Sequence, residues 1–266
     1  MAAATPRTID LNADVGESFG PWPMGADTEL IPLVTSVNVA CGAHAGDPST
    51  ILRTCELAVR HRVAIGAHPG YPDLAGFGRR DLDLTPEELR ATLVVQVGAV
   101  VAGARVAGVK IRHVKPHGAM YNRAARDPAT AATIAEAVRD LSEGLVLIGL
   151  AGSASVAAGR EAGLRVAEEG FADRRYEADA SLRSRRLDGA LLRPAEAAQQ
   201  AVSIARDGFV IAADGSRVAV RADTICIHGD GPEAVDVARA VRSALAEAGI
   251  RVAPLGDGYG GGLGGG

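Results

Sequence analysis

Residues 36–60, SVNVACGAHAGDPSTILRTCELAVR, contain a complete pattern of strand, loop and helix. The run Ser36–Ala40 is short, apolar and rich in valine, which is typical of a buried β-strand. Asp47 then precedes Pro48, so an N-cap residue stands directly before a proline at the first helical position. The stretch is therefore one βα unit, and repetition of such units predicts a parallel sheet.

The same alternation runs from one end of the chain to the other. The expected strands are Thr8–Leu11, Ser36–Ala40, Val63–Ala67, Ile111–Lys115, Leu145–Gly149, Arg165–Glu168 and Thr224–His228, with a weaker eighth at Ile250–Ala253. We expect an α/β fold, a TIM-like (β/α) barrel of seven or eight units, in a single domain over residues 1–255. A doubly wound open sheet has the same alternation and is the alternative. The Gly-rich tail, 256–266, is expected to be disordered.

Capping and turn signals mark the ends of several elements. Further helix starts are expected at Thr85-Pro86, Asp127-Pro128 and Gly231-Pro232, and helix ends at Gly163 and Gly249. Thr85 and Glu88 also have the spacing of a capping box. The segment Phe209–Val220 breaks the alternation, because two β-rich runs joined by Asp214-Gly215 predict a hairpin.

Composition argues against several classes of function. The 266 residues have a net charge of -4 and only 3% aromatic residues, so we expect no surface for nucleic acid. The cysteines, Cys41, Cys55 and Cys226, form no CxxC pair, which favours a reduced cytoplasmic compartment over a disulfide framework. No apolar signal segment begins the chain, and polar and glycine residues interrupt the run 94–109, so no membrane span is expected.

Side chains that can carry chemistry cluster after the expected strands. In a parallel barrel the loops that follow the strands meet on one rim, where active sites form. The candidates on this rim are Asn12, Asp14, Glu17, His44, His68, Arg79, Arg80, Lys115, His117, Asn122, Glu169, Asp173, Arg174, His228 and Asp230. Four of the six histidines belong to this set, whereas His61 and His113 are interpreted as structural or surface residues.

Asp14, His44 and His68 are the candidates for holding a divalent metal. Carboxylate and imidazole are suitable ligands, although no local motif such as HExxH supports the site. A solvated loop charge is the alternative for the aspartate, and a backbone hydrogen bond is the alternative for each histidine. Asp47 is equally well explained as a helix cap alone.

Lys115 is unusual because the chain otherwise uses arginine, with Lys110 as its one other lysine. A compact ammonium at a strand end can stabilise a carbonyl, carboxylate or phosphoryl oxygen, and a salt-bridged lysine is the alternative. The loop 68–80, HPGYPDLAGFGRR, offers Arg79 and Arg80 to phosphate oxygens, or is only a turn over the barrel mouth. The P-loop motif GxxxxGK[ST] does not occur.

Six segments resemble one protein family, and they follow the order of that family. They are DLNADVGESFG (10–20), NVACGAHAGDP (38–48), GAHPGYPDLAGFGRR (66–80), HVKPHGAMYN (113–122), FADRRY (171–176) and ICIHGDGP (225–232). Together they resemble the LamB/YcsF family, described as the A subunit of 5-oxoprolinase. Ala13 stands where a cysteine is expected, Ala43 where a bulkier residue is common, and Ala180 where a glycine is expected. None of these departures removes a candidate acid, base or cation.

The resemblance implies a barrel related to glycoside hydrolases and deacetylases. It implies opening of 5-oxo-L-proline to L-glutamate, coupled to hydrolysis of ATP to ADP and phosphate, with subunits B and C as partners. ATP is the expected cofactor, and a divalent metal is a second candidate. Two alternatives are a metal-dependent deacetylase or amidohydrolase that works without ATP, and a non-catalytic carbohydrate- or lactam-binding protein.

Opening a lactam needs activated water, charge stabilisation, an anchor for the substrate anion and a proton donor. The expected roles are water activation for Asp14, His44 and His68, directly or through a metal; charge stabilisation for Lys115 and Arg174; anion binding for Arg79 or Arg80; and proton transfer for His117, Asp173 and His228. The remaining candidates, Asn12, Glu17, Asn122, Glu169 and Asp230, are expected to contact the substrate.

Overall fold

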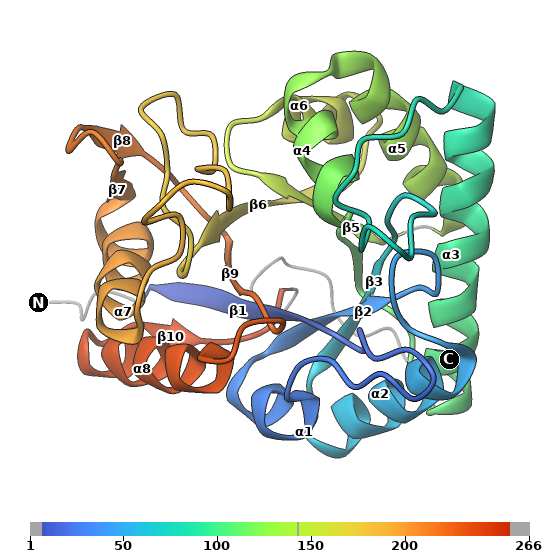
Figure 1. Ribbon diagram of the computed structural model, residues 1–266, viewed down its shortest axis with the longest axis horizontal. Coiled ribbons are helices and arrows are strands. Elements are labelled where there is room, and N and C mark those ends of the chain that lie inside the picture. Colours follow the sequence, from blue (N-terminus) through green and yellow to red (C-terminus); the bar gives the residue numbers. More distant parts are fainter. Residues whose placement is uncertain (1–6, 143, 256–266) are drawn as a thin grey trace, which may run out of the picture.

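Seven parallel strands form a closed barrel in the computed structural model, which describes residues 7–142 and 144–255 (Figure 1). The strands are β1 (Thr8–Val15), β2 (Ser36–Ala40), β3 (Ala64–His68), β4 (His113–Val114), β5 (Val146–Leu150), β6 (Arg165–Phe171) and β9 (Thr224–Ile227). Each strand pairs with the next and β9 pairs with β1, so the ring is complete. The predicted barrel is confirmed, and the open sheet is wrong. The tail 256–266 lies outside the described residues.

The expected eighth strand does not enter the ring. β10 (Arg251–Val252) pairs with Thr8 and Ile9 at the start of β1. The later residues of β1 pair with β2 and β9 instead. The barrel therefore has seven strands, and the weak run at the end of the chain adds a short strand beside β1.

Helices surround this barrel. In the described part of the chain they are α1 (Asp27–Leu30), α2 (Pro48–Arg60), α3 (Pro86–Val106), α4 (Gly118–Arg126), α5 (Pro128–Leu141), α6 (Ala154–Glu161), α7 (Pro194–Val202) and α8 (Ala234–Glu247), with a 3₁₀ turn at Ile31–Leu33 and a π-helical turn at Ser203–Asp207. Figure 1 shows α3 on one side of the barrel and α7 with α8 on the opposite side.

Three of the four predicted helix starts are confirmed. The carboxylates of Asp47 and Asp127 accept hydrogen bonds from backbone amides in the first turns of α2 and α5. Thr85 and Glu88 form both hydrogen bonds of the predicted capping box at the start of α3. These caps satisfy amide groups that have no partner inside the helix, which explains why they are visible in the sequence.

The helix start predicted at Gly231-Pro232 is wrong. α8 begins at Ala234, because the amide of Ala234 donates to the carbonyl of Gly231 and closes a turn before the helix. Both predicted helix ends are confirmed, since Gly163 and Gly249 follow α6 and α8 with φ of 78° and 71°. Glycine adopts this left-handed conformation without a steric cost.

The predicted hairpin is confirmed. Strands β7 (Phe209–Ile211) and β8 (Arg217–Ala219) pair antiparallel, and Gly215 in the turn has a φ of 87°. The hairpin extends from the barrel on the side of α7 in Figure 1.

Helix α3 is long and apolar enough, by length and composition, to cross a membrane, and within the described residues it is the one helix that is. The glycines and polar residues that interrupt its apolar run do not lower its hydropathy enough to rule out a membrane span by length and composition. Its buried side chains, including Leu89, Leu93 and Val97, belong to the hydrophobic core. Contacts with α2 and α5 place α3 in the outer layer of helices around the barrel.

Strand β1 continues four residues beyond its predicted end, because residues 12–15 pair with β2, and its inward-facing side chains are polar. Ile9 and Leu11 belong to the hydrophobic core outside the ring, whereas Asp10, Asn12 and Asp14 form hydrogen bonds across its interior. Alternation of this kind usually indicates one face in water. Here it indicates a barrel with a polar interior. β6 likewise runs past its predicted end, to Phe171.

Asp10 is buried at the deep end of this interior. Its carboxylate accepts hydrogen bonds from the hydroxyl groups of Thr35, Ser36 and Thr224, at 2.8, 2.7 and 2.5 Å. The Asn12 amide donates to Thr224 Oγ1 at 2.7 Å and thereby links this group to the layer above. Burial raises the pKa of Asp10 to about 6, although the three hydroxyl groups lower it.

We expect the contribution of Asp10 to the stability of the protein to fall as the pH rises from about 4 to about 6. Between about pH 4 and pH 6 the folded state retains a proton on Asp10 that the unfolded chain has lost, so raising the pH disfavours folding. The shift implies a loss of ~2 kcal/mol in the unfolding free energy between pH 4.5 and 7.5. Urea unfolding of the wild type and Asp10→Asn at both pH values measures it. If the unfolding free energies of the two proteins differ by the same amount at both pH values, the prediction is contradicted.

Candidate active site

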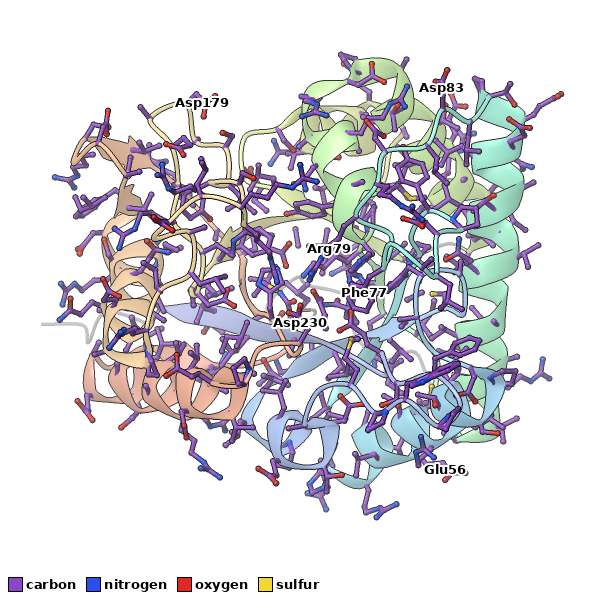
Figure 2. The ribbon with its side chains drawn as sticks, viewed as in Figure 1. Glu56, Phe77, Arg79, Asp83, Asp179 and Asp230 are labelled. Carbon is purple, nitrogen blue, oxygen red and sulfur yellow. The ribbon has the colours of Figure 1, made fainter. Side chains whose placement is uncertain are left out.

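A cavity of about 790 Å³ opens at the ends of the strands, within the range of roughly 300–1,000 Å³ typical of small-molecule sites. Eight predicted residues line it: Asp14, His68, Arg79, Lys115, His117, Asn122, Arg174 and His228. In Figure 2, Phe77, Arg79 and Asp230 lie near the middle of the molecule, whereas Glu56, Asp83 and Asp179 lie at its periphery.

Seven predicted residues do not line the cavity, namely Asn12, Glu17, His44, Arg80, Glu169, Asp173 and Asp230. Six of them contact a side chain that does. The seventh, Arg80, has a largely exposed side chain that pairs with Asp73 within its own loop. Asp47 is an N-cap that also accepts a hydrogen bond from the amide of Gly20 at 3.0 Å.

The ammonium of Lys115 lies beneath the cavity among four acceptors. Its Nζ is 3.0 Å from Asp14 Oδ1 and 2.9 Å from Glu169 Oε1. Asn12 Oδ1 at 3.3 Å and Cys226 Sγ at 3.0 Å complete the set. Burial lowers the pKa of Lys115, but Asp14, Cys226 and Glu169 outweigh it and hold the pKa well above its usual value. Lys115 is thus salt-bridged and also supplies a fixed positive charge to the cavity.

Asp14 is held as a carboxylate with one oxygen fixed. Its Oδ1 accepts hydrogen bonds from Lys115 and, at 2.8 Å, from Asn38 Nδ2. Its Oδ2 lies 3.5 Å from His68 Nε2. Burial raises the pKa of Asp14, but the charges of His68 and Lys115 hold it well below the usual value. An ionised carboxylate that lines a cavity beside a histidine can accept a proton from water.

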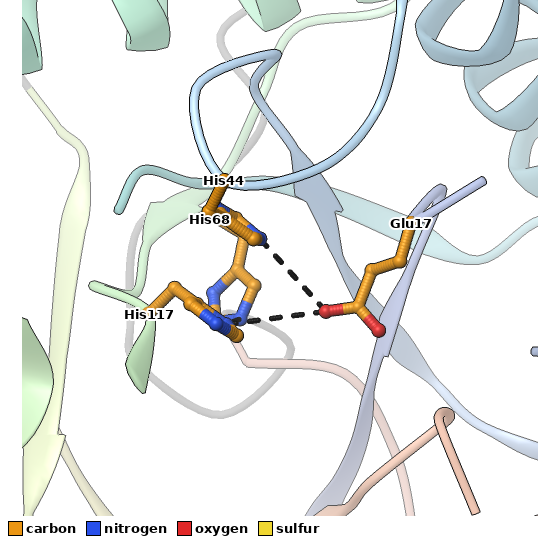
Figure 3. A group of neighbouring side chains, drawn as sticks. All are labelled: Glu17, His44, His68 and His117. Carbon is orange, nitrogen blue, oxygen red and sulfur yellow. Dashed lines mark hydrogen bonds and ion pairs between the residues drawn. The ribbon is translucent and has the colours of Figure 1, made fainter. Parts of the chain in front are cut away.

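Three histidines meet beside Glu17 (Figure 3). His68 Nδ1 is 2.8 Å from the carbonyl oxygen of Lys115, and His117 Nε2 is 2.8 Å from that of Phe77. A carbonyl only accepts, so each of these nitrogens carries the proton. The other two, His68 Nε2 and His117 Nδ1, then face each other at 3.0 Å, each with a lone pair when the rings are neutral. A shared proton or a cation resolves this repulsion.

His44 completes the group. Its ring stacks on His117 with centroids 3.8 Å apart. Neither ring nitrogen of His44 has a hydrogen-bond partner among the described residues, and His44 Nε2 lies 3.8 Å from Glu17 Oε1. Burial lowers the pKa of His44 and His117 well below the usual value, with further lowering by neighbouring histidines, and so favours the neutral rings that bind metals.

The residues of this group fit a divalent metal. One ligand atom from each of Glu17, His44, His68 and His117 lies within 4.8 Å of the others. Burial raises the pKa of Glu17 well above its usual value, and the negative charges of Asp14 and Asp230 raise it further. A cation would reverse that effect, because it favours the carboxylate. Two of the three predicted ligands are in this group, whereas Asp14 lies in a second group with Cys226 and His228.

His228 and Asp173 form a separate pair on the cavity wall. His228 Nδ1 is 3.0 Å from both carboxylate oxygens of Asp173, and the amide of His228 donates to Asp173 Oδ2 at 3.1 Å. The ring also stacks on Phe171, with centroids 5.4 Å apart. A carboxylate that holds one imidazole nitrogen orients the ring and stabilises its protonated form. His228 is therefore suited to proton transfer.

Among the residues missed from the sequence are one that lines the cavity, Arg185, and one that supports its acids from beneath, Asn38. Arg185 lines it and pairs with Asp230 at 3.0 Å, and the arginine-rich run SLRSRRL (181–187) was the available signal. Asn38 donates to both Asn12 and Asp14, and its polar side chain in an apolar strand was the signal. His113 is buried, and its Nε2 lies 2.8 Å from Asn38 Oδ1, which agrees with its interpretation as a structural residue.

Comparisons with known proteins agree with this architecture. The chain is 54% identical over 251 residues to the A subunit of 5-oxoprolinase from Methylococcus capsulatus, covering 94% of this chain and 96% of the relative. It is 54% identical over 245 residues to the protein of the same name from Tolumonas auensis, covering 92% and 98%. The crystal structure of a lactam utilization protein from Thermus thermophilus matches with a TM-score of 0.88 and 49% identity, covering 92% and 99%. The model of the LamB/YcsF family matches residues 9–259, and the chain belongs to this family.

Proposed function

We propose that this chain is the A subunit of an ATP-dependent 5-oxoprolinase, which opens 5-oxo-L-proline to L-glutamate together with subunits B and C. One observation carries the proposal: Asp14, the buried Lys115, and His228, which Asp173 holds from behind, line one cavity. A base, a positive charge and a proton donor are what amide hydrolysis requires. The names of the relatives supply the substrate. The three free, buried thiols support a cytoplasmic location.

The proposed reaction uses these groups in turn. Asp14, beside His68, accepts a proton from water as the water oxygen attacks the lactam carbon. Lys115 stabilises the negative charge that develops on the carbonyl oxygen. His228 donates a proton to the ring nitrogen as the carbon–nitrogen bond breaks, and Asp173 stabilises the imidazolium form. Phosphorylation of the lactam oxygen by ATP, which releases ADP, would explain ATP use because it makes the ring carbon more electrophilic. Addition of water and breakage of the carbon–nitrogen bond then leave an acyl phosphate, which a second water hydrolyses to L-glutamate and phosphate.

Glu17, His44, His68 and His117 are the residues that would hold a divalent metal. When bound, the metal supplies positive charge that polarises a carbonyl oxygen or water. This group also favours the second candidate function, a metal-dependent deacetylase or amidohydrolase that acts without ATP.

Glutamate release tests the proposal. The chain is assayed with 5-oxo-L-proline alone and with subunits B and C, each with and without ATP and with and without a chelator. We expect glutamate only when all three proteins and ATP are present. Amide hydrolysis by the chain alone, independent of ATP and abolished by the chelator, would instead support the second candidate function. Binding of the lactam without turnover under every condition would indicate a non-catalytic binding protein.

We expect zinc to bind at the histidine group. Calorimetric titration of the wild type should show binding that His44→Ala weakens at least ~10-fold, since changing even a residue that only supports a ligand commonly costs ~10–100-fold in metal affinity. His61→Ala is the matched control, because His61 is exposed at the end of α2. Equal zinc affinity of His44→Ala and the wild type would contradict the assignment.

A further inference from the structure

One carboxylate joins two cavity-lining arginines from different loops. Asp230, between β9 and α8, lies 2.5 Å from Arg79 Nη2 and 3.0 Å from Arg185 Nη1, both measured to Oδ2. Arg79 comes from the loop after β3, and Arg185 from the loop after β6. Figure 2 shows Arg79 and Asp230 close together near the middle of the molecule. Asp230 therefore offsets much of the charge that these two guanidinium groups offer to a ligand.

Arg174 lines the same cavity without such a partner. Its residue is only 7% exposed, and no carboxylate of the described chain lies within ion-pair distance of it. Its Nη2 donates to the carbonyl of Arg183 at 2.6 Å, and its Nε has no acceptor. The neighbouring acid, Asp173, holds His228 with both oxygens. Burial and then Arg185 lower the pKa of Arg174 to about 10, so it is a cation at neutral pH.

A buried guanidinium without a carboxylate is costly, and an anion from a ligand relieves that cost. The geometry points to Arg174 as the anchor for a single carboxylate of the substrate, and to Asp230 as the counter-charge on Arg79 and Arg185 that disfavours free inorganic phosphate at this carboxylate subsite. This rests on the proposed function, in which the carboxylate belongs to 5-oxo-L-proline. Arg174 thereby takes the anion-binding role that the sequence had suggested for Arg79 or Arg80.

Calorimetric titration of the full chain tests the anchor, with 5-oxo-L-proline and its uncharged analogue 2-pyrrolidone as probes. Arg174→Gln should weaken 5-oxo-L-proline binding by ~10–100-fold, the usual range for losing a hydrogen bond to a charged group, and should leave 2-pyrrolidone unaffected. Arg174→Lys, which keeps the charge, should retain part of the affinity. Arg175→Gln is the matched control, because Arg175 pairs with Glu196 away from the cavity. Unchanged affinity in Arg174→Gln, or equal binding of both probes by the wild type, overturns the anchor.

Inorganic phosphate tests the role of Asp230. Asp230→Asn frees Arg79 and Arg185, so we expect phosphate affinity to rise at least ~10-fold relative to 5-oxo-L-proline affinity. An unchanged ratio overturns the selectivity.

The two proposals fail in different ways. Arg174-dependent binding of acetate or L-proline, with no preference for the lactam, would leave the anchor in place and count against the oxoprolinase. If the wild type binds none of these carboxylates, the assignment of Arg174 as the anchor is wrong. Glutamate release by the complete complex then still tests the proposed function.

Discussion

Asp14→Asn should lower glutamate release by the assembled enzyme by ~10²–10⁴-fold, the usual contribution of a general base. The asparagine side chain retains the shape of the aspartate, so one oxygen can still face Lys115 and Asn38. It cannot accept a proton from water, because the amide is not basic. The loss should therefore appear in turnover. The unfolding free energy and the affinity for 5-oxo-L-proline are measured on the same protein, so that a loss of turnover is separated from a loss of folding or of binding.

Asp10→Asn is the matched control for this experiment. Asp10 lies on the same strand and the same inward face, four residues deeper, and does not line the cavity. This variant should retain most of the wild-type turnover while changing the pH dependence of stability. Near-normal turnover of Asp14→Asn, or an equal loss in both variants, would contradict the role of Asp14.

Lys115→Ala should reduce both turnover and stability. Losing the charge that faces the developing oxyanion should lower turnover at least ~100-fold. The change also leaves the buried carboxylates of Asp14 and Glu169 without their cation, which typically costs ~3–5 kcal/mol of unfolding free energy. Steady-state glutamate release and urea unfolding measure the two effects separately.

Lys110→Ala provides the control, since Lys110 is the other lysine of the chain and is exposed. It should change neither quantity appreciably. If Lys115→Ala loses stability but keeps near-normal turnover per folded molecule, then Lys115 is only a structural ion pair and its role in the reaction is wrong.

The barrel could be predicted from the sequence because its signals are local. Asp47, Thr85 and Asp127 cap their helices through groups two or three residues away. Gly163 and Gly249 mark helix ends for an equally local reason. Closure of the ring was an expectation from the repeated βα pattern, and the pairing of β9 with β1 confirms it.

The polar interior of the barrel could not be predicted from local sequence signals. Asn12, Asp14 and Glu169 were expected on loops after the strands, but all three lie within β1 or β6. Their alternation with apolar residues is also the pattern of a strand with one face in water. Periodicity alone does not distinguish a polar face that contacts water from one that contacts other polar groups. Several contacts that satisfy them join residues more than 100 positions apart, as between Lys115 and Asp14 or Asn12 and Glu169.

The candidate site was predicted as a set of residues but not as an arrangement. Four histidines were expected on one rim, and three of them gather around Glu17 while His228 pairs with Asp173. Chain order cannot reveal this division, since it depends on which loops fold inward. The shared contact of Arg79 and Arg185 with Asp230 is equally non-local. The substrate came from the family resemblance.

The central claim is that the rim of this barrel opens the lactam. It is tested most directly by titrating the chain into fixed amounts of subunits B and C with ATP and 5-oxo-L-proline, and measuring glutamate. We expect a rate that rises with added wild-type chain until the partners are saturated, and almost no glutamate with Asp14→Asn. Glutamate formation by subunits B and C alone at the same rate, or equal slopes for the two chains, would contradict it.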